Sequence, residues 1–239
     1  MIRFFLCFLF LSTSVIANTT EDNTLTITLN EQSLQLRYPQ PTRMATVLND
    51  YYANTDDDFY LLGAVLSDDD KQHEINTLKD EVMNQLKQVE NNEALISQLN
   101  AFFYVDRIFT SLDRDLVRID DGSNPLFSGR YTLSTSAIPS SITVIGAIES
   151  DSPIVLPLIE HASADSYLKQ VEISTNADNT QIAVIQPDGV VQITEFTLWK
   201  NNPVYLAPGA VVFVPLSQLP PELVSLNESI IQLLRNKAL

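Results

Sequence analysis

Residues 24–48 read TLTITLNEQSLQLRYPQPTRMATVL, and this stretch decides the fold predicted for the N-terminal half. Residues 24–29 alternate threonine with leucine or isoleucine, which is typical of a strand with one buried face. Residues 34–38 alternate again after a short polar turn, so the two strands are expected to form a hairpin. Two prolines end the second strand, and residues 42–48 predict a short helix. A hairpin followed by a helix predicts a small sheet packed on one helix.

A second unit of the same kind is predicted in the C-terminal half. Residues 60–66 (YLLGAVL) resemble residues 205–212 (YLAPGAVV), and each segment follows a strand pair and a short helix. The two short helices are expected at 42–48 and 164–171. Strands at 181–186 and 190–194, joined by Pro-Asp-Gly, give a strong hairpin signal. The chain is therefore expected to contain two related units.

Residues 70–103 interrupt the first unit with a predicted helical hairpin. Apolar residues recur at helical spacing on both sides of an Asn-Asn break at 91–92. After this insertion the pattern favours strands again, at 107–112 and 116–119, on either side of a turn. The first unit is therefore expected to resume its sheet after residue 105.

The final segment predicts an amphipathic helix that opens on two prolines. Its acidic residues come early and its basic residues late, as the helix dipole favours, and no basic face suits a membrane surface. Packing on the chain itself or docking on a protein partner are the two interpretations that we favour. The apolar stripe that would do so is Leu223, Leu226, Ile230, Leu233 and Leu234.

Residues 1–17 read MIRFFLCFLFLSTSVIA and predict a secretory signal peptide that is cleaved after Ala17. A transmembrane anchor is the alternative, but the apolar run is shorter than the ~20 residues that span a bilayer. Cleavage would remove Arg3 and Cys7 and change the formal net charge from −16 to −17. No later stretch is apolar for long enough to span a membrane, so the mature chain is expected to have no transmembrane segment.

The composition excludes several function classes. Thirty acidic residues against 14 basic ones argue against nucleic-acid binding, which needs clustered Lys and Arg. A single cysteine can form neither an internal disulfide framework nor a thiolate zinc site. The acidic runs at 56–58, 68–70 and 120–121 lack the spacing of a calcium loop, so they predict turns and helix starts rather than a metal site. We therefore expect no metal and no cofactor.

Basic residues are scarce, so their positions are informative. Arg107, Arg114, Arg118 and Arg130 fall within 24 residues, and Arg43 follows a Pro-Gln-Pro bend. Arginines in a cleft would suit the recognition of acidic sugars, because a guanidinium pairs bidentately with a carboxylate. Salt bridges to the surplus acids nearby are the alternative. We take Arg107 and Arg43 as the candidate ligand-binding residues.

Seven short motifs, taken in order and spacing, resemble the GfcC-type capsule biosynthesis family of Gram-negative bacteria. They are YPQPTR at 38–43, NPL at 124–126, QPDG at 186–189, Trp199, YLAPGA at 205–210, PEL at 221–223 and LLRN at 233–236. The resemblance implies a periplasmic α+β protein with two β-grasp-like domains, a helical hairpin inserted in the first and a C-terminal amphipathic helix. It also implies a role in capsule or exopolysaccharide secretion without an enzymatic activity.

On this resemblance we expect a first domain at 18–139 with its insertion at about 70–103, a second domain at 140–217 and the final helix at 218–239. The family arginine in a cleft corresponds best to Arg107, although Asp106 replaces the glycine that usually precedes it. The expected function is a non-enzymatic accessory role in polysaccharide assembly or export. The protein would bind a saccharide or a component of the outer-membrane export machinery.

Two other functions stay open from the sequence. The first is a periplasmic enzyme that trims or modifies polysaccharide with a pair of carboxylates, because 30 acids always offer pairs. The second is a purely structural partner whose final helix docks into another subunit. A deep cleft with two converging acids would favour the enzyme, and an exposed apolar stripe on the last helix would favour the docking protein.

Overall fold

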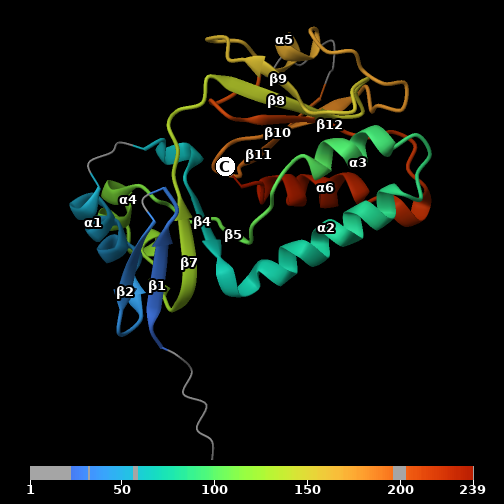
Figure 1. Cartoon of the computed structure of the whole chain (residues 1–239). Coiled ribbons are helices and arrows are strands. Elements are labelled where there is room, and N and C mark those ends of the chain that lie inside the picture. The colour runs from blue at the N-terminus through green and yellow to red at the C-terminus, as the bar shows by residue number, and fades with distance from the viewer. Residues whose placement is uncertain (1–22, 32, 56–58, 196–202, 239) are drawn as a thin grey trace, which may run out of the picture.

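Two five-stranded mixed sheets organise the chain, with helices packed against both (Figure 1). The computed structural model describes residues 23–31, 33–55, 59–195 and 203–238. The predicted signal peptide and Trp199 lie outside the described residues. The predicted α+β class is confirmed.

The first sheet has the strand order β2-β1-β7-β4-β5, in which β1 and β7 are parallel and every other pair is antiparallel. Its strands are β1 (Leu25–Leu29), β2 (Leu34–Tyr38), β4 (Val65–Asp68), β5 (Arg107–Ile108) and β7 (Gly129–Ser134). The predicted hairpin is β1 and β2. The buried face of β1 packs on helix α1 (Met44–Asn54), whose Val47 and Leu48 are fully buried, and this contact forms the first hydrophobic core.

The second sheet has the same order, β9-β8-β12-β10-β11, again with one parallel pair, β8 with β12. Its strands are β8 (Ser141–Gly146), β9 (Ile154–Pro157), β10 (Gln181–Ile185), β11 (Val191–Glu195) and β12 (Val211–Val214). Helix α5 (Ala164–Leu168) follows the first hairpin here, as α1 does in the first unit. The two units therefore share one topology.

The detailed alignment predicted between the two units is wrong. Residues 60–66 lead into β4, whereas residues 205–212 lead into β12. In the shared strand order, the counterpart of β4 is β10, and the counterpart of β12 is β7. Both segments are apolar runs that follow a tyrosine and a glycine-containing turn, so their likeness reflects a common way of entering a buried strand.

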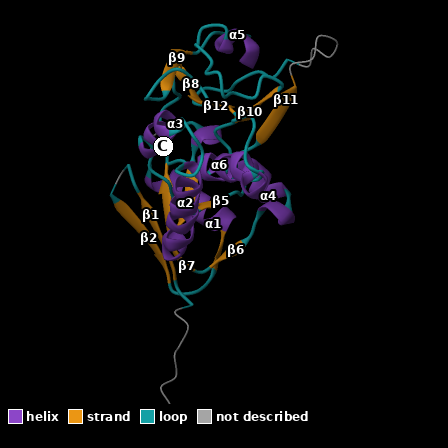
Figure 2. Ribbon diagram, turned by 90° about the vertical axis from the view of Figure 1, so that its right-hand side faces the viewer, coloured by secondary structure: helices purple, strands orange, loops and turns teal. Residues whose placement is uncertain are grey.

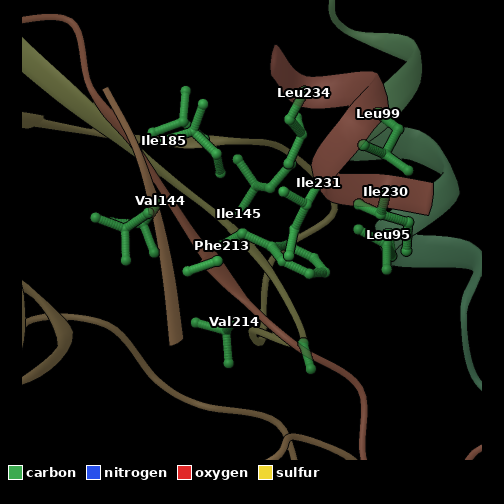
Figure 3. Close-up of a cluster of buried hydrophobic side chains, with 14 of the residues drawn as sticks. Leu95, Leu99, Val144, Ile145, Ile185, Phe213, Val214, Ile230, Ile231 and Leu234 are labelled. Carbon is green, nitrogen blue, oxygen red and sulfur yellow. The ribbon is translucent and has the colours of Figure 1, made fainter. Parts of the chain in front are cut away.

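Three helices from distant parts of the chain cover one face of the second sheet. Helices α2 (Gln72–Leu86) and α3 (Glu93–Asn100) lie between β4 and β5 in sequence, and α6 (Leu226–Arg235) closes the chain. Figures 1 and 2 show α6 enclosed between the second sheet and α2. Figure 3 shows Leu95 of α3 beside Ile230 of α6, and Ile231 of α6 beside Phe213 of β12, in this core. The helices inserted in the first unit thus complete the core of the second.

The apolar stripe of the final helix packs inside the chain. Its five residues are at most 6% exposed and belong to the larger hydrophobic core, so they do not form a free docking face. The stripe is Leu223, Leu226, Ile230, Leu233 and Leu234. Of the two interpretations favoured from the sequence, packing on the chain itself is the one that the structure supports.

Helix α4 (Arg114–Ile119) replaces the strand predicted at 116–119. The Asp113 carboxylate accepts hydrogen bonds from the backbone N–H groups of Asp115 and Leu116, at 2.8 and 3.1 Å. This N-cap satisfies donors that a helix start leaves free, and it outweighs the alternating pattern of the segment. The strand predicted before it shortens to β5.

The remaining elements are short. They are β3 (Thr42–Arg43), which pairs with β6 (Leu126–Phe127), and the 3-10 turns η1 (Leu61–Gly63), η2 (Asp69–Lys71), η3 (Asp121–Ser123) and η4 (Pro221–Leu223). Among the helices that the structure describes, none is both long and apolar enough to cross a membrane.

The end of the chain is bound to the segment that follows α3. The backbone N–H of Val105 donates to the carbonyl of Asn236 at 2.9 Å, and that of Ala238 donates to the carbonyl of Phe103 at 2.8 Å. The side chain of Asn236 accepts a hydrogen bond from the backbone N–H of Arg107 at 3.0 Å. These bonds place residues 236–238, which follow α6, beside β5, where the two units meet.

Candidate anion-binding site

Arg107 lies in β5, at the junction of the two units. One terminal nitrogen of its guanidinium, Nη2, donates to the carbonyl of Pro187 at 2.5 Å and to that of Ala64 at 3.3 Å. Ala64 directly precedes β4 of the first sheet, and Pro187 lies in the turn between β10 and β11 of the second sheet. The position of the guanidinium is therefore fixed by backbone groups from both units.

A cavity of about 310 Å³, which we call the junction cavity, opens beside Arg107. Residues from both sheets and from the end of α6 form its walls, and Pro139, Pro187 and Pro208 make much of the surface apolar and stiff. Its volume falls within the range of small-molecule sites. Three cationic side chains, Arg107, Arg235 and Lys237, reach it.

None of these three cations has an acidic partner in the described chain. No described carboxylate lies within 4.0 Å of their nitrogens, although the whole chain carries a net charge of −16. Among the described residues that line the junction cavity, none is aspartate or glutamate. The cavity is therefore a local excess of positive charge in an acidic protein.

Burial and mutual repulsion act on these cations. Burial lowers the pKa of Arg107 to about 10, with Arg235 adding to the effect and Asp188 opposing it. Burial, and then the charge of Arg107, also lower the pKa of Lys237. Each shift means that the charged form is held at a free-energy cost, which a bound anion would offset. Perturbed groups around one cavity are typical of binding sites.

Two hydroxyl groups complete the polar lining. The Tyr60 hydroxyl and the Ser136 Oγ are buried without a hydrogen-bond partner among the described residues, and both residues line the junction cavity. Burial, followed by the charge of Asp188, raises the pKa of Tyr60, so its hydroxyl keeps the proton and can donate. Buried polar groups normally have partners. A ligand with oxygen acceptors would supply them.

A larger cavity of about 680 Å³, the outer cavity, adjoins the first. Tyr60, Arg107 and Arg235 line both. Phe109 stands in the outer cavity with the Arg235 guanidinium 4.3 Å from its ring centroid, and Arg107 lies 5.5 Å from the same centroid. Arg235 Nε also donates to the carbonyl of Gly189 at 2.8 Å. Arg235 is thus held between the final helix and the β10–β11 turn.

The other arginines considered from the sequence do not join this site. Arg43 is exposed in β3, where its Nη1 donates to the carbonyl of Asn124 at 2.8 Å, and it lines neither cavity. Arg130 is paired with Asp70, and Arg118 lies 3.7 Å from Asp115, so the salt-bridge alternative holds for these two. Arg114 instead donates to the Asn49 side chain at 2.8 Å.

Sequence reasoning missed four residues of the site: Tyr60, Ser136, Arg235 and Lys237. They come from segments up to 177 positions apart, and only the topology brings them together. The one available signal was the pair of bases at the end of the final helix. Basic residues are favoured at the C-terminal end of a helix by the helix dipole, so these two bases gave no reason to expect a binding role.

An enzymatic site and a metal site both find little support in the described residues. Residues 161–165 contain His161, Ser163 and Asp165, the residue types of a hydrolase triad, but the His161 ring is 90% exposed and the Ser163 hydroxyl donates to the Asp165 carboxylate. Within the described ranges, no three His, Cys, Asp or Glu side chains gather as a metal site would require. Asp113 and Asp188 line the outer cavity only.

The fold and the cavity together define an α+β protein of two sheets with one topology and a cationic cavity at their junction. Residues 21–137 match the family described as capsule biosynthesis GfcC, N-terminal, and residues 152–238 match capsule biosynthesis GfcC, C-terminal. The chain belongs to the GfcC capsule biosynthesis family, as its motifs predicted. The first region contributes Arg107 to the junction cavity, and the second contributes Arg235 and Lys237.

A relative from Escherichia coli strain K12, described as uncharacterized protein YjbG, is 32% identical over 124 residues. The alignment covers 52% of this chain and 50% of that protein, so this chain matches about half the length of that relative.

Proposed function

We propose that this protein is an exported, non-enzymatic accessory component of capsule or exopolysaccharide assembly, and that it binds an anionic saccharide in the junction cavity. Membership of a capsule biosynthesis family supports the process. The observation that carries the binding role is the group of three cations that have no carboxylate partner among the described residues, in a chain of net charge −16. A carboxylate or phosphate on a sugar would neutralise them.

The two alternatives have less support. A carboxylate-pair enzyme finds no acid among the described residues that line the junction cavity, and of the two cavities beside Arg107 only the outer one has a carboxylate pair, Asp113 and Asp188. A protein that docks through its last helix would need an apolar face that is instead buried within the chain. The polysaccharide export machinery of the outer membrane stays a candidate partner through other surfaces.

Export to the periplasm is part of the proposal and rests on the pattern of residues 1–17. Fractionation of cells that produce the full chain tests it, together with mass spectrometry of the purified protein. We expect a periplasmic protein whose N-terminus is Asn18. A product that keeps residues 1–17 would contradict the cleavage.

We further infer that each unit is a β-grasp domain and that α2 and α3 form the inserted helical hairpin. The shared strand order, with the first and last strands parallel at the centre and a helix after the first hairpin, supports the fold assignment. The place of α2 and α3 between β4 and β5 supports the insertion. A crystal structure compared with known β-grasp domains tests both.

Deletion of the gene in its own host, with surface polysaccharide measured, tests the proposed function. We expect the deletion to reduce surface polysaccharide, wild type to restore it, and Arg107→Gln or Lys237→Gln to restore it poorly. Arg43→Gln is the matched control, since Arg43 is exposed and lines neither cavity.

Two results would contradict the proposal. Unchanged surface polysaccharide in the deletion strain would remove the role in assembly. Full rescue by both cavity variants would remove the role of the cavity. Circular dichroism and thermal melting of the purified variants separate a loss of binding from a loss of folding, which matters because Arg107 bonds to both units.

A further inference from the structure

Resting on the proposed function, we infer a charge pattern for the ligand: an acidic sugar in the junction cavity linked to a neutral sugar in the outer cavity. The inference concerns the two cavities as one site. It depends on the side chains that line both cavities, on the hydrophobic side chains of the outer cavity, and on the positions of Asp113 and Asp188.

The two cavities share part of their walls. Tyr60, Arg107 and Arg235 line both, so a ligand that fills the two cavities would pass beside these three side chains. Volumes of about 310 and 680 Å³ leave room for a small group in the first and a larger one in the second. Both values are in the range that small ligands occupy in proteins. The arrangement suits a chain of sugars better than a single sugar.

The outer cavity is distinguished by large hydrophobic side chains that stay exposed at its surface. Four of its residues are large hydrophobic side chains left exposed: Leu61 (39%), Leu62 (37%), Phe109 (44%) and Val190 (51%). Side chains of this kind gathered in one concave surface mark a binding site rather than scattered exposure. A pyranose ring has an apolar C–H face that can cover them.

Phe109 is held in place on several sides. Arg235 and Arg107 lie over its ring at 4.3 and 5.5 Å from the centroid. Gly189 approaches so closely that a Cβ built on it would lie 2.2 Å from Phe109 Cε1. A ring fixed in this way loses little freedom when a ligand packs on it, so the platform is preorganised.

The charges of the outer cavity select against a second anion. Asp113 and Asp188 line this cavity and not the junction cavity. They offset Arg107 and Arg235, whereas Lys237 adds a third cation to the junction cavity alone. A carboxylate on the second sugar would meet like charge, which is how binding sites discriminate against close analogues. The second sugar is therefore neutral.

Calorimetry with four defined sugars tests the inference on the full mature chain. The probes are glucuronate, the disaccharide glucuronosyl-N-acetylglucosamine, galacturonate and digalacturonate. We expect the mixed disaccharide to bind about tenfold more tightly than glucuronate, from burial of one apolar sugar face. Digalacturonate is expected to bind no more than about twofold more tightly than galacturonate.

Variants of the outer cavity test its role separately. Leu62→Asn, at a residue that lines the outer cavity and not the junction cavity, should reduce the gain of the mixed disaccharide over glucuronate to about twofold. Ile193→Asn is the matched control, because Ile193 is 62% exposed on β11 and does not line the outer cavity. Asp188→Asn should let digalacturonate bind more tightly than galacturonate, because it removes one of the two carboxylates of the outer cavity.

The outcomes separate the inference from the proposed function. One outcome is that glucuronate binds, that Arg107→Gln abolishes this binding, and that the mixed disaccharide binds no more tightly than glucuronate. This outcome would overturn the inference and leave the proposed function standing. An equal gain for digalacturonate would overturn the charge pattern. Failure of all four sugars to bind would count against the saccharide-binding function itself.

Discussion

Gln98 of α3 links the inserted helices to the second sheet, and its replacement gives the sharpest stability prediction. The side chain is fully buried and makes three hydrogen bonds to backbone. Its Oε1 accepts from the N–H of Gly146 at 2.8 Å, and its Nε2 donates to the carbonyls of Gly146 and Ser150 at 3.2 and 2.7 Å. Gln98→Leu keeps the approximate size and removes all three.

The expected cost follows from these bonds. Each hydrogen bond contributes about 1 kcal/mol net, and a buried group left without its partner costs about 1–3 kcal/mol. The N–H of Gly146 would lose the Gln98 oxygen as its acceptor, so we expect Gln98→Leu to lower the free energy of unfolding by about 3–5 kcal/mol. A loss of this size is a large share of the stability of an ordinary domain.

Gln98→Glu adds a pH signature. The carboxylate still accepts from Gly146 but faces two carbonyl oxygens, so burial and these oxygens should raise its pKa in the folded state. A group with a raised folded pKa contributes stability below its unfolded pKa and loses it as the pH rises through the folded value. Stability of Gln98→Glu should therefore improve on acidification relative to wild type.

Urea unfolding followed by circular dichroism measures both variants, at pH 7 and pH 4.5. Gln170→Leu is the control, since Gln170 is exposed and bonds only to the carbonyl of Ser166, and it should change stability by less than about 0.5 kcal/mol. A cost below about 1 kcal/mol for Gln98→Leu would refute the reasoning, because the backbone groups would then have found other partners.

Three further results are expected. Leu233→Ala should lower the free energy of unfolding by about 2–5 kcal/mol in denaturant titrations, since Leu233 is fully buried; a cost under about 1 kcal/mol would contradict its core position. Asp106→Asn should raise the free energy of unfolding at pH 7 by about 0.5 kcal/mol in denaturant titrations, because burial and then Glu74 and Asp68 raise the pKa of the Asp106 carboxyl and make its ionised form unfavourable; this gain should vanish in acid, where the carboxyl is protonated in the folded and unfolded states. Glucuronate affinity should fall as the pH rises to about 10.5, because burial lowers the pKa values of both Lys237 and Arg107 and the cavity loses positive charge; a flat profile by calorimetry would argue against the role of these cations.

The sequence predicted the elements whose local pattern agrees with their final environment. Strands β1 and β2 alternate strictly, and β10 and β11 flank a Pro-Asp-Gly turn, so tertiary contacts only reinforce the local preference. The strand predicted at 116–119 failed because the cap at Asp113 satisfies the helix start, a contribution that hydrophobic periodicity does not register.

The candidate site could be predicted only in part. Arg107 follows from a family motif and from the scarcity of basic residues, whereas Lys237 joins it because the chain end pairs with the segment around Tyr104. That pairing spans more than 130 positions and leaves no local pattern. The cavity therefore depends on topology, which periodicity and composition do not specify.

The hydrogen bonds between residues 103–105 and residues 236–238 have a consequence for how the chain is made. Contacts so distant in sequence are slow to form, because the intervening loop must close first. During synthesis, α2 and α3 are complete long before α6 exists to pack against α2. The core of the second unit therefore cannot close until α6 has emerged, and a nascent chain stalled before α6 would leave apolar side chains of α2 exposed.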